Sequence, residues 1–177
     1  INARAPAVKS VTPEISIETE IRYRERTEKA TLLGTMHQYI YAGRLAIRHG
    51  RFLNAEDDLF MRKVGVLGAD LAGKLFGGED PLGRYVSIQK GGEVLIVGVL
   101  EHEEKSFIST VSDFDTSNNN RLFIPAAAMD RVGADSQFFF LSGEAVAEDR
   151  IEEAKREILA VLDSNHGRWD GKVEKFM

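Results

Sequence analysis

Residues 64–84 read Val-Gly-Val-Leu-Gly-Ala-Asp-Leu-Ala-Gly-Lys-Leu-Phe-Gly-Gly-Glu-Asp-Pro-Leu-Gly-Arg, and this stretch decides the fold. Its first apolar run, 64–67, together with Lys63 before it, predicts a short buried strand over 63–67 that Gly68 closes. Residues 70–76 then carry apolar side chains at helical spacing before two glycines, an ending typical of helices. The turn residues 80–83 follow directly. The stretch therefore predicts a strand, a short helix and a tight turn in succession.

The same stretch contains a partial phosphate-binding motif. Residues 68–74 match Gly-x4-Gly-Lys, but such a loop needs Ser or Thr next, because that hydroxyl holds magnesium. The next residue here is Leu75. We therefore interpret 70–76 as an amphipathic helix in which Leu71, Leu75 and Phe76 pack inward and Lys74 lies in solvent.

The flanking sequence predicts an α+β fold, with mostly antiparallel sheets and a few helices. Residues 14–25 alternate apolar and polar side chains, which indicates a half-buried antiparallel strand, and 29–34 is its expected hairpin partner. Gly91-Gly92 separates two further strands of a second hairpin, 85–89 and 93–101. The remaining predicted elements are a short helix after the N-cap Asn54, strands 121–124 and 137–142, and helices 126–132 and 149–164.

Composition excludes several functions. The 177 residues carry a net charge of −5 with scattered basic residues, whereas nucleic-acid binding needs clustered Lys and Arg. The absence of cysteine excludes disulfides, thiolate metal sites and a cysteine nucleophile. No apolar run approaches the roughly 18 residues that span a bilayer. Because the chain starts at Ile1 and ends without a boundary signal, we expect a fragment whose membrane anchors, if present, lie outside it.

No pattern of catalytic or metal-binding residues emerges. Residues 113–119 resemble the start of a calcium loop, but Asn118 and Ile124 stand where glycine and a bidentate glutamate are required. The four histidines lack zinc-ligand spacing, and no Gly-x-Ser-x-Gly motif is present. We predict that the domain is not an enzyme and binds no cofactor or metal.

Three stretches together resemble a known family. They are 50–54, the stretch 64–84 with the hairpin that ends at 94–101, and 122–125 before the late His166-Gly167. In this order they are similar to the MacB-type periplasmic core domain of ABC transporter permeases, in the MacB, LolC/LolE and FtsX-like superfamily. The likeness runs from about Ala7 to Phe176. Its glycines have folding roles: Gly83 suits a positive φ, and Gly98 inside a strand indicates a bulge or close packing.

The resemblance implies two subdomains, a porter-like α/β subdomain of residues 1–50 and 125–177 and an inserted β-rich one of residues 51–124. It implies a periplasmic or extracellular domain of a cell-membrane permease that transmits ATP-driven movement in export, efflux or lipoprotein release. The implied partners are a second permease copy, a cytoplasmic ATP-binding subunit or domain, and an exported substrate or periplasmic partner protein.

The polar segment 102–120 holds the candidate site residues. Phe107 and Ile108 are predicted partner contacts, although a solvated loop without a partner explains the segment equally well. The alternative function is a free-standing ligand-binding or enzymatic α+β domain, which would need a deep apolar pocket.

Overall fold

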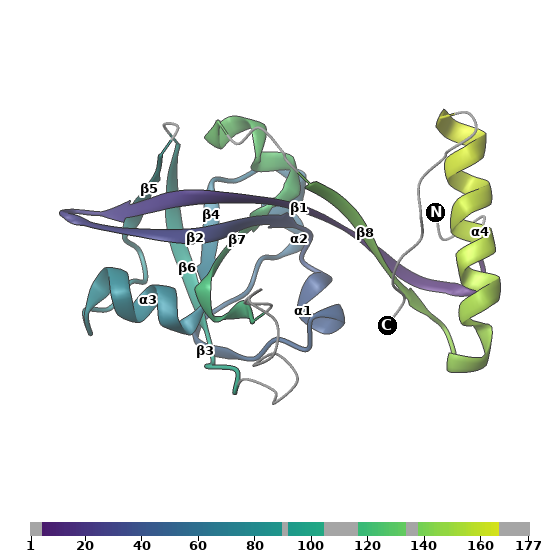
Figure 1. Ribbon diagram of the computed structural model, residues 1–177, viewed down its shortest axis with the longest axis horizontal. Coiled ribbons are helices and arrows are strands. Elements are labelled where there is room, and N and C mark those ends of the chain that lie inside the picture. Colours follow the sequence, from purple (N-terminus) through teal and green to yellow (C-terminus); the bar gives the residue numbers. More distant parts are fainter. Residues whose placement is uncertain (1–4, 90–91, 105–116, 134–137, 167–177) are drawn as a thin grey trace. The chain divides into compact units, whose positions relative to one another are not determined.

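A computed structural model describes residues 5–89, 92–104, 117–133 and 138–166 (Figure 1). Its contacts divide the chain into unit 1, Ile1–Pro13 with Phe140–Met177, and unit 2, Glu14–Phe139. The subdomain boundaries expected from the sequence, 50/51 and 124/125, both lie inside unit 2. Strand pairing accounts for this, since it joins residues 31–35 to 121–125 and residues 47–50 to 98–100.

Unit 2 is built on a sheet that closes on itself. Its strands are β1 (Val8–Tyr23), β2 (Arg26–Thr35), β3 (Ile47–Gly50), β4 (Val64–Leu67), β5 (Tyr85–Ile88), β6 (Glu93–Leu100) and β7 (Arg121–Pro125). Both predicted hairpins, β1–β2 and β5–β6, are present. The path β2-β7-β4-β6-β5-β1 returns to β2 through the first hairpin and so forms a ring, with β3 outside it on β6. Most pairings are antiparallel, as expected, whereas β2–β7 and β4–β6 are parallel.

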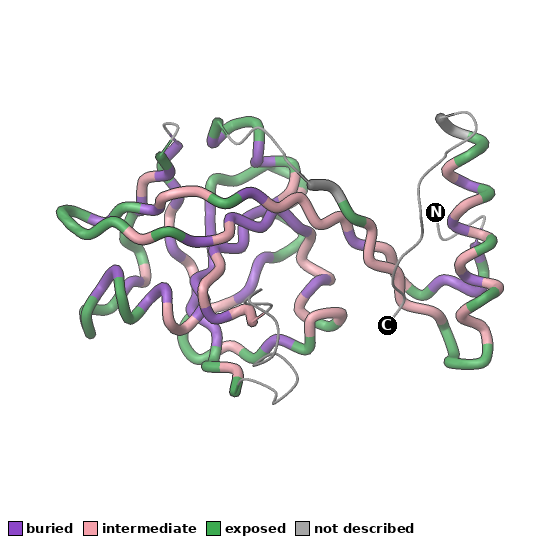
Figure 2. The backbone as a smooth tube through the Cα atoms, viewed as in Figure 1, coloured by how far each residue is buried: buried purple, intermediate pink, exposed green. Residues whose placement is uncertain are grey.

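Short helices lie between these strands: α1 (Tyr39–Ala42), α2 (Ala55–Leu59) and α3 (Ala69–Phe76). In α3 the residues Leu71, Leu75 and Phe76 are buried and Lys74 is exposed, which confirms the amphipathic interpretation. Phe76 stacks on Tyr23 of β1 with ring centroids 4.1 Å apart. Figure 2 shows the buried positions concentrated along the strands and on one side of α3. Unit 2 thus has one core cluster in which α3 packs against the ring, and a second in which Phe123 of β7 packs with Tyr39 of α1 and Phe52.

Gly98 marks a bulge in β6, as its position in the sequence predicted. Gly65 pairs with Ile96 but the next residue, Val66, pairs with Gly98, so Val97 is an extra residue. A side chain at position 98 would overlap the backbone of Arg51. The bulge and the close packing therefore occur together.

The predicted helix 126–132 is instead two 3-10 turns, Ala126–Ala128 and Asp130–Val132. Met129 N–H donates to the Ala126 carbonyl, a spacing of three residues, and Gly133 at φ +66° ends the second turn. The Val132 N–H likewise donates to the Met129 carbonyl, so both turns close over three residues, as in a 3-10 helix.

Unit 1 combines both parts of the chain that flank unit 2. The start of β1 lies there with β8 (Phe138–Ala145) and α4 (Ile151–His166), the predicted long helix. The Val146 N–H donates to the Ala7 carbonyl at 3.0 Å, and the Ala7 N–H donates to Glu157 Oε2 at 2.8 Å. Small side chains, including Ala7 and Ala154, let the helix approach the strand. No helix among the described residues is long and apolar enough to cross a membrane.

Candidate functional site

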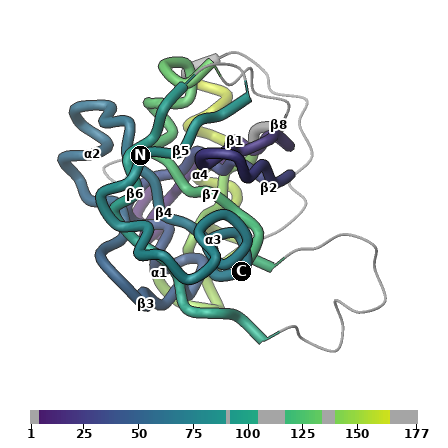
Figure 3. Tube along the Cα trace, turned by 90° about the vertical axis from the view of Figure 1, so that its left-hand side faces the viewer, coloured from purple at the N-terminus to yellow at the C-terminus, as the bar shows by residue number. Residues whose placement is uncertain are grey.

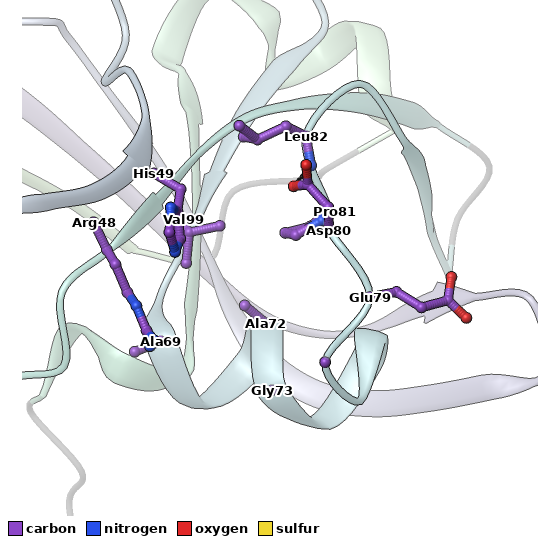
Figure 4. A pocket seen from close by; sticks show the side chains of 11 residues that line it. Arg48, His49, Ala69, Ala72, Gly73, Glu79, Asp80, Pro81, Leu82 and Val99 are labelled. Atoms are coloured by element: carbon purple, nitrogen blue, oxygen red, sulfur yellow. Dashed lines mark hydrogen bonds between the residues drawn. The ribbon is translucent and has the colours of Figure 1, made fainter.

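A hollow of about 380 Å³ opens in unit 2 beside α3 (Figure 4). Small side chains of α3, Ala69 and Ala72, lie on its floor, and no atom outside the helix lies within 4 Å of the position that a Gly73 side chain would occupy. The volume is at the lower end of the range for small-ligand sites. Its residues are Arg48, His49, Ala69, Ala72, Gly73, Gly78, Glu79, Asp80, Pro81, Leu82 and Val99.

Two of the family-like stretches meet at this hollow. Gly50 has φ +75°, and a side chain there would overlap the Val97 carbonyl and press on Leu82. The Gly83 N–H donates to the Ile96 carbonyl at 2.9 Å, with Gly83 at φ +74° as predicted. These contacts bring Gly50, the turn 78–83 and the strand residues 94–101 together. The stretch 64–84 and Val99 therefore supply most of the wall of the hollow, which Arg48 and His49 complete.

The tip of the β1–β2 hairpin fixes the loop on one side of the hollow. Arg24 Nη1 lies 3.0 Å from Glu79 Oε1, and the Tyr23 hydroxyl donates to Glu79 Oε2 at 3.5 Å. Arg26 Nη1 donates to the Leu75 carbonyl at 3.5 Å, close to Gly77, where a side chain would overlap the guanidinium. We call Tyr23, Arg24 and Arg26 the hairpin clasp. It caps the C-terminus of α3 with a cation and holds the loop that follows.

The two carboxylates at the hollow are engaged in structural contacts, whereas its two basic residues are not. Figure 4 shows Glu79 directed away from the hollow, toward the side on which it pairs with Arg24. Asp80 accepts the Leu82 N–H at 3.0 Å, so its carboxylate is engaged in the turn. Arg48 and His49 are exposed, and neither has a side-chain partner among the described residues. The described ranges contain no cluster of three His, Cys, Asp or Glu that could hold a metal.

A second polar site is buried at α2. Asn54 and Asp57 form a capping box, as the predicted N-cap suggested, and Arg51 Nη1 lies 2.5 Å from Asp57 Oδ2. Arg62 Nη1 adds a longer contact of 3.6 Å to Asp57. Burial raises the pKa of Asp57, but hydrogen bonds from Arg51 and the Asn54 N–H, with both guanidinium charges, outweigh it and leave the pKa below its ordinary value.

The predicted contacts Phe107 and Ile108 lie outside the described residues, so this site stays a prediction. The residues at the two ends of their segment are tied together. The Asn118 N–H donates to Glu103 Oε2 at 3.1 Å, and the buried Asn119 side chain donates to the Glu103 carbonyl at 2.8 Å and accepts the Glu103 N–H at 2.9 Å. Sequence reasoning missed these hydrogen bonds of Glu103, the hairpin clasp and the Arg51–Asp57 pair. The residues in each of these contacts do not follow a periodic spacing in the sequence.

Comparison of the sequence with known proteins identifies the family of this chain. The model of the MacB-like periplasmic core domain matches residues 1–161. The ABC transporter permease YknZ of Bacillus subtilis is 29% identical over 163 residues, which are 92% of this chain and 39% of that protein. The macrolide export ATP-binding/permease protein MacB of Azoarcus sp. is 25% identical over 97% of the chain and 25% of its own length. The chain thus spans well under half the length of these relatives.

Solved structures show the same fold. The extracellular domain of YknZ superposes with a TM-score of 0.77 at 24% identity, covering 94% of this chain and 80% of that one. The periplasmic region of MacB from Actinobacillus actinomycetemcomitans gives a TM-score of 0.75 at 21% identity, covering 95% and 72%. The match to the family model includes residues 50–54, 64–101 and 122–125. The chain belongs to the family of MacB-like periplasmic core domains.

Proposed function

We propose that this domain relays ATP-driven movement from the membrane part of an ABC transporter permease to a substrate or partner protein outside the cytoplasm. Family membership gives the coarser statement, an extracytoplasmic domain of a MacB-like permease. The proposal adds the relay of movement itself. It also adds two partners, a second permease copy and an ATP-binding subunit or domain. Export, efflux and lipoprotein release are the candidate processes.

The observation that carries the proposal is the course of β1. This single strand begins at Val8 in unit 1 and ends at Tyr23 in unit 2, where the hairpin clasp holds α3 and the loop beside the hollow. A hydrogen-bonded strand resists stretching, so displacement of its first residues passes to its last ones. Movement of unit 1 would therefore reach the hollow through β1.

We also propose that the domain has no catalytic activity of its own. In the hollow, both carboxylates serve structural contacts, Glu79 with the clasp and Asp80 within its turn. His49 is the remaining titratable side chain of the hollow, and among the described residues it has no side-chain partner that would orient it or act with it in acid–base chemistry. A purified domain that turns over a substrate, with the activity lost on one substitution in the hollow, would contradict this part.

The relay is tested by lengthening β1 between the units. Gly-Ser is inserted between Pro13 and Glu14 in the full-length permease together with its ATP-binding subunit. We expect ATP hydrolysis to continue while the ATP-dependent change in amide hydrogen exchange of the β1–β2 hairpin disappears, because the inserted residues absorb the displacement. Hydrogen–deuterium exchange with mass spectrometry makes the measurement.

A matched control inserts Gly-Ser between Ala147 and Glu148, in the exposed turn after β8 within unit 1. This variant should keep the ATP-dependent exchange change in the hairpin. If the insertion after Pro13 leaves that change intact, β1 is not the relay. If ATP never alters exchange in unit 2, the proposed function itself fails.

A further inference from the structure

The turn after α2 exposes three large apolar side chains in a row. Leu59, Phe60 and Met61 are 72, 57 and 40% exposed, and we call them the apolar tip. Figure 3 shows α2 at the periphery of the traced chain in that view, away from α3. Single exposed apolar residues are ordinary, whereas a contiguous run has a free-energy cost in water and usually marks a contact surface.

The backbone of the apolar tip is held in an unfavourable conformation. The Met61 N–H donates to the Asp58 carbonyl and the Arg62 N–H to the Asp57 carbonyl, a Schellman motif at the helix end. Glycine usually occupies the left-handed position of this motif, but Met61 stands there with φ +50°. Such strain persists where a side chain is needed at that point, which indicates a functional role for the methionine.

The surroundings of the apolar tip keep it ordered. Arg62 bridges to Glu56 at 3.1 Å and to Asp57 at 3.6 Å, and its guanidinium lies 5.4 Å from the centre of the Phe60 ring. Arg131 Nη1 donates to the Met61 carbonyl at 3.4 Å. A turn fixed from both sides loses little conformational entropy when it docks, and this favours a shaped protein surface over a fluid lipid surface.

Two exposed cations flank the apolar tip: Lys63 follows it in the chain, and Arg131 donates to the Met61 carbonyl. The acidic residues of α2 are engaged with other side chains, Glu56 with Arg62 and Asp58 with His37 at 2.6 Å. Lys63 and Arg131 are exposed, and among the described residues neither has a carboxylate within ion-pair distance. The complementary surface would therefore be apolar with carboxylates at its edge.

We propose that the apolar tip docks into an apolar depression, bordered by Asp or Glu, on a separate extracytoplasmic protein. This inference rests on the proposed function and names the surface through which the domain contacts that partner. Leu59 and Phe60 supply the apolar contact, Met61 orients it, and Lys63 with Arg131 pairs with the acidic border.

The test places a photo-reactive phenylalanine analogue at position 60 of the full-length permease in its native cells. A second permease carries the analogue at Tyr85, which is also exposed, at 59%. We expect position 60, and not position 85, to cross-link to one protein other than the permease. Lys63→Glu should lower that yield at least tenfold, while Arg22→Glu, the same charge change at an exposed position of β1, leaves it unchanged.

The purified cross-linked protein is then titrated against the full-length permease. Leu59→Ser and Phe60→Ser should each raise its Kd at least tenfold, and added salt should weaken binding to the unaltered permease more than to Lys63→Glu. Both serines replace exposed side chains, so folding is retained.

Three results would overturn the docking proposal: cross-links to lipid only, cross-links to a second permease copy only, or equal yields at positions 60 and 85. Its failure is separable from that of the relay. If the insertion after Pro13 abolishes the ATP-dependent exchange change while Lys63→Glu leaves the cross-link unaffected, the relay stands and the docking surface is wrong.

Discussion

Gly98 and Gly73 lie in opposite environments, and the same substitution should have opposite effects on them. A methyl group at position 98 would overlap the Arg51 carbonyl, a backbone atom that cannot move aside without shifting β3. At position 73 it would meet nothing outside its own helix within 4 Å. Gly98→Ala should therefore lower the free energy of unfolding by about 3 kcal/mol. Gly73→Ala should raise it by about 0.5–1 kcal/mol, because alanine favours helix.

Urea denaturation of the two variants and the unaltered domain makes this comparison. Equal effects would show that the packing around Gly98 relaxes more than the structure implies.

Met61 offers a stabilising substitution. Met61→Gly removes the left-handed strain but increases the conformational freedom of the unfolded chain, so the net gain in free energy of unfolding should be about 1 kcal/mol. Thermal unfolding of the domain should show the higher Tm. A lower Tm would mean that the methionine side chain stabilises the turn through packing, which would remove the strain argument for a contact role.

At the scale of single residues, the sequence predicted the conformations that depend on neighbouring residues alone. Gly83 has the positive φ that its turn requires, and Asn54 forms the predicted cap. Met61 could not be predicted, because nothing in its type indicates a left-handed φ. Its conformation follows from the hydrogen bonds that end α2.

At the scale of the element, α2 depends on a buried carboxylate. Asp57→Asn leaves Arg51 and Arg62 without their anion and should lower the free energy of unfolding by about 2 kcal/mol at pH 7. Because the pKa of Asp57 is lowered in the folded state, its stabilisation is complete above the unfolded pKa of about 3.9 and disappears as the pH falls through the folded value. The difference from the unaltered domain should therefore be constant from pH 7 to 5 and shrink below about pH 4.

Glu56→Gln provides the control for this titration. Glu56 is 65% exposed and contacts Arg62 at the surface, so its loss should change the free energy of unfolding by less than about 0.5 kcal/mol. Denaturation curves of both variants at pH 7, 5 and 3.5 give the comparison. A difference for Asp57→Asn that is no smaller at pH 3.5 than at pH 7 would contradict the assignment of the stabilising charge to Asp57.

Elements with a clear period were predicted well. The alternation in β1 and β2, the helical spacing in α3 and α4 and the Gly-Gly turn of the second hairpin are signals within a few residues. The prediction for segment 126–132 was wrong because three alanines suit a helix by propensity, whereas the segment forms two 3-10 turns that end at Gly133. The hairpin clasp joins residues 55 apart, and local pattern carries no information about such contacts.

At the scale of the whole molecule, the family-like motifs identified the fold class and the family while leaving the topology open. The ring of strands closes through the parallel pair β2–β7, whose residues lie about 90 positions apart, from Thr31 with Arg121 to Thr35 with Pro125. The wall of the hollow depends on Gly50 and Gly98, which lie in two separated stretches and let their backbones approach closely. Sequence alone suggested those glycines had folding roles but could not bring them together.

The hydrogen bonds of Ala7 to Val146 and Glu157 have a consequence for the order of folding. A ribosome delivers residues 14–139 before β8 and α4 emerge, so unit 2 can assemble while the first residues still lack their partners. To form unit 1, its N-terminal and C-terminal segments must then meet across about 150 residues of chain. Because unit 2 is already folded between them, the ends of these segments are closer together than in an unfolded chain. A destabilised unit 2 would thus delay maturation of the unit whose two halves it separates in the chain.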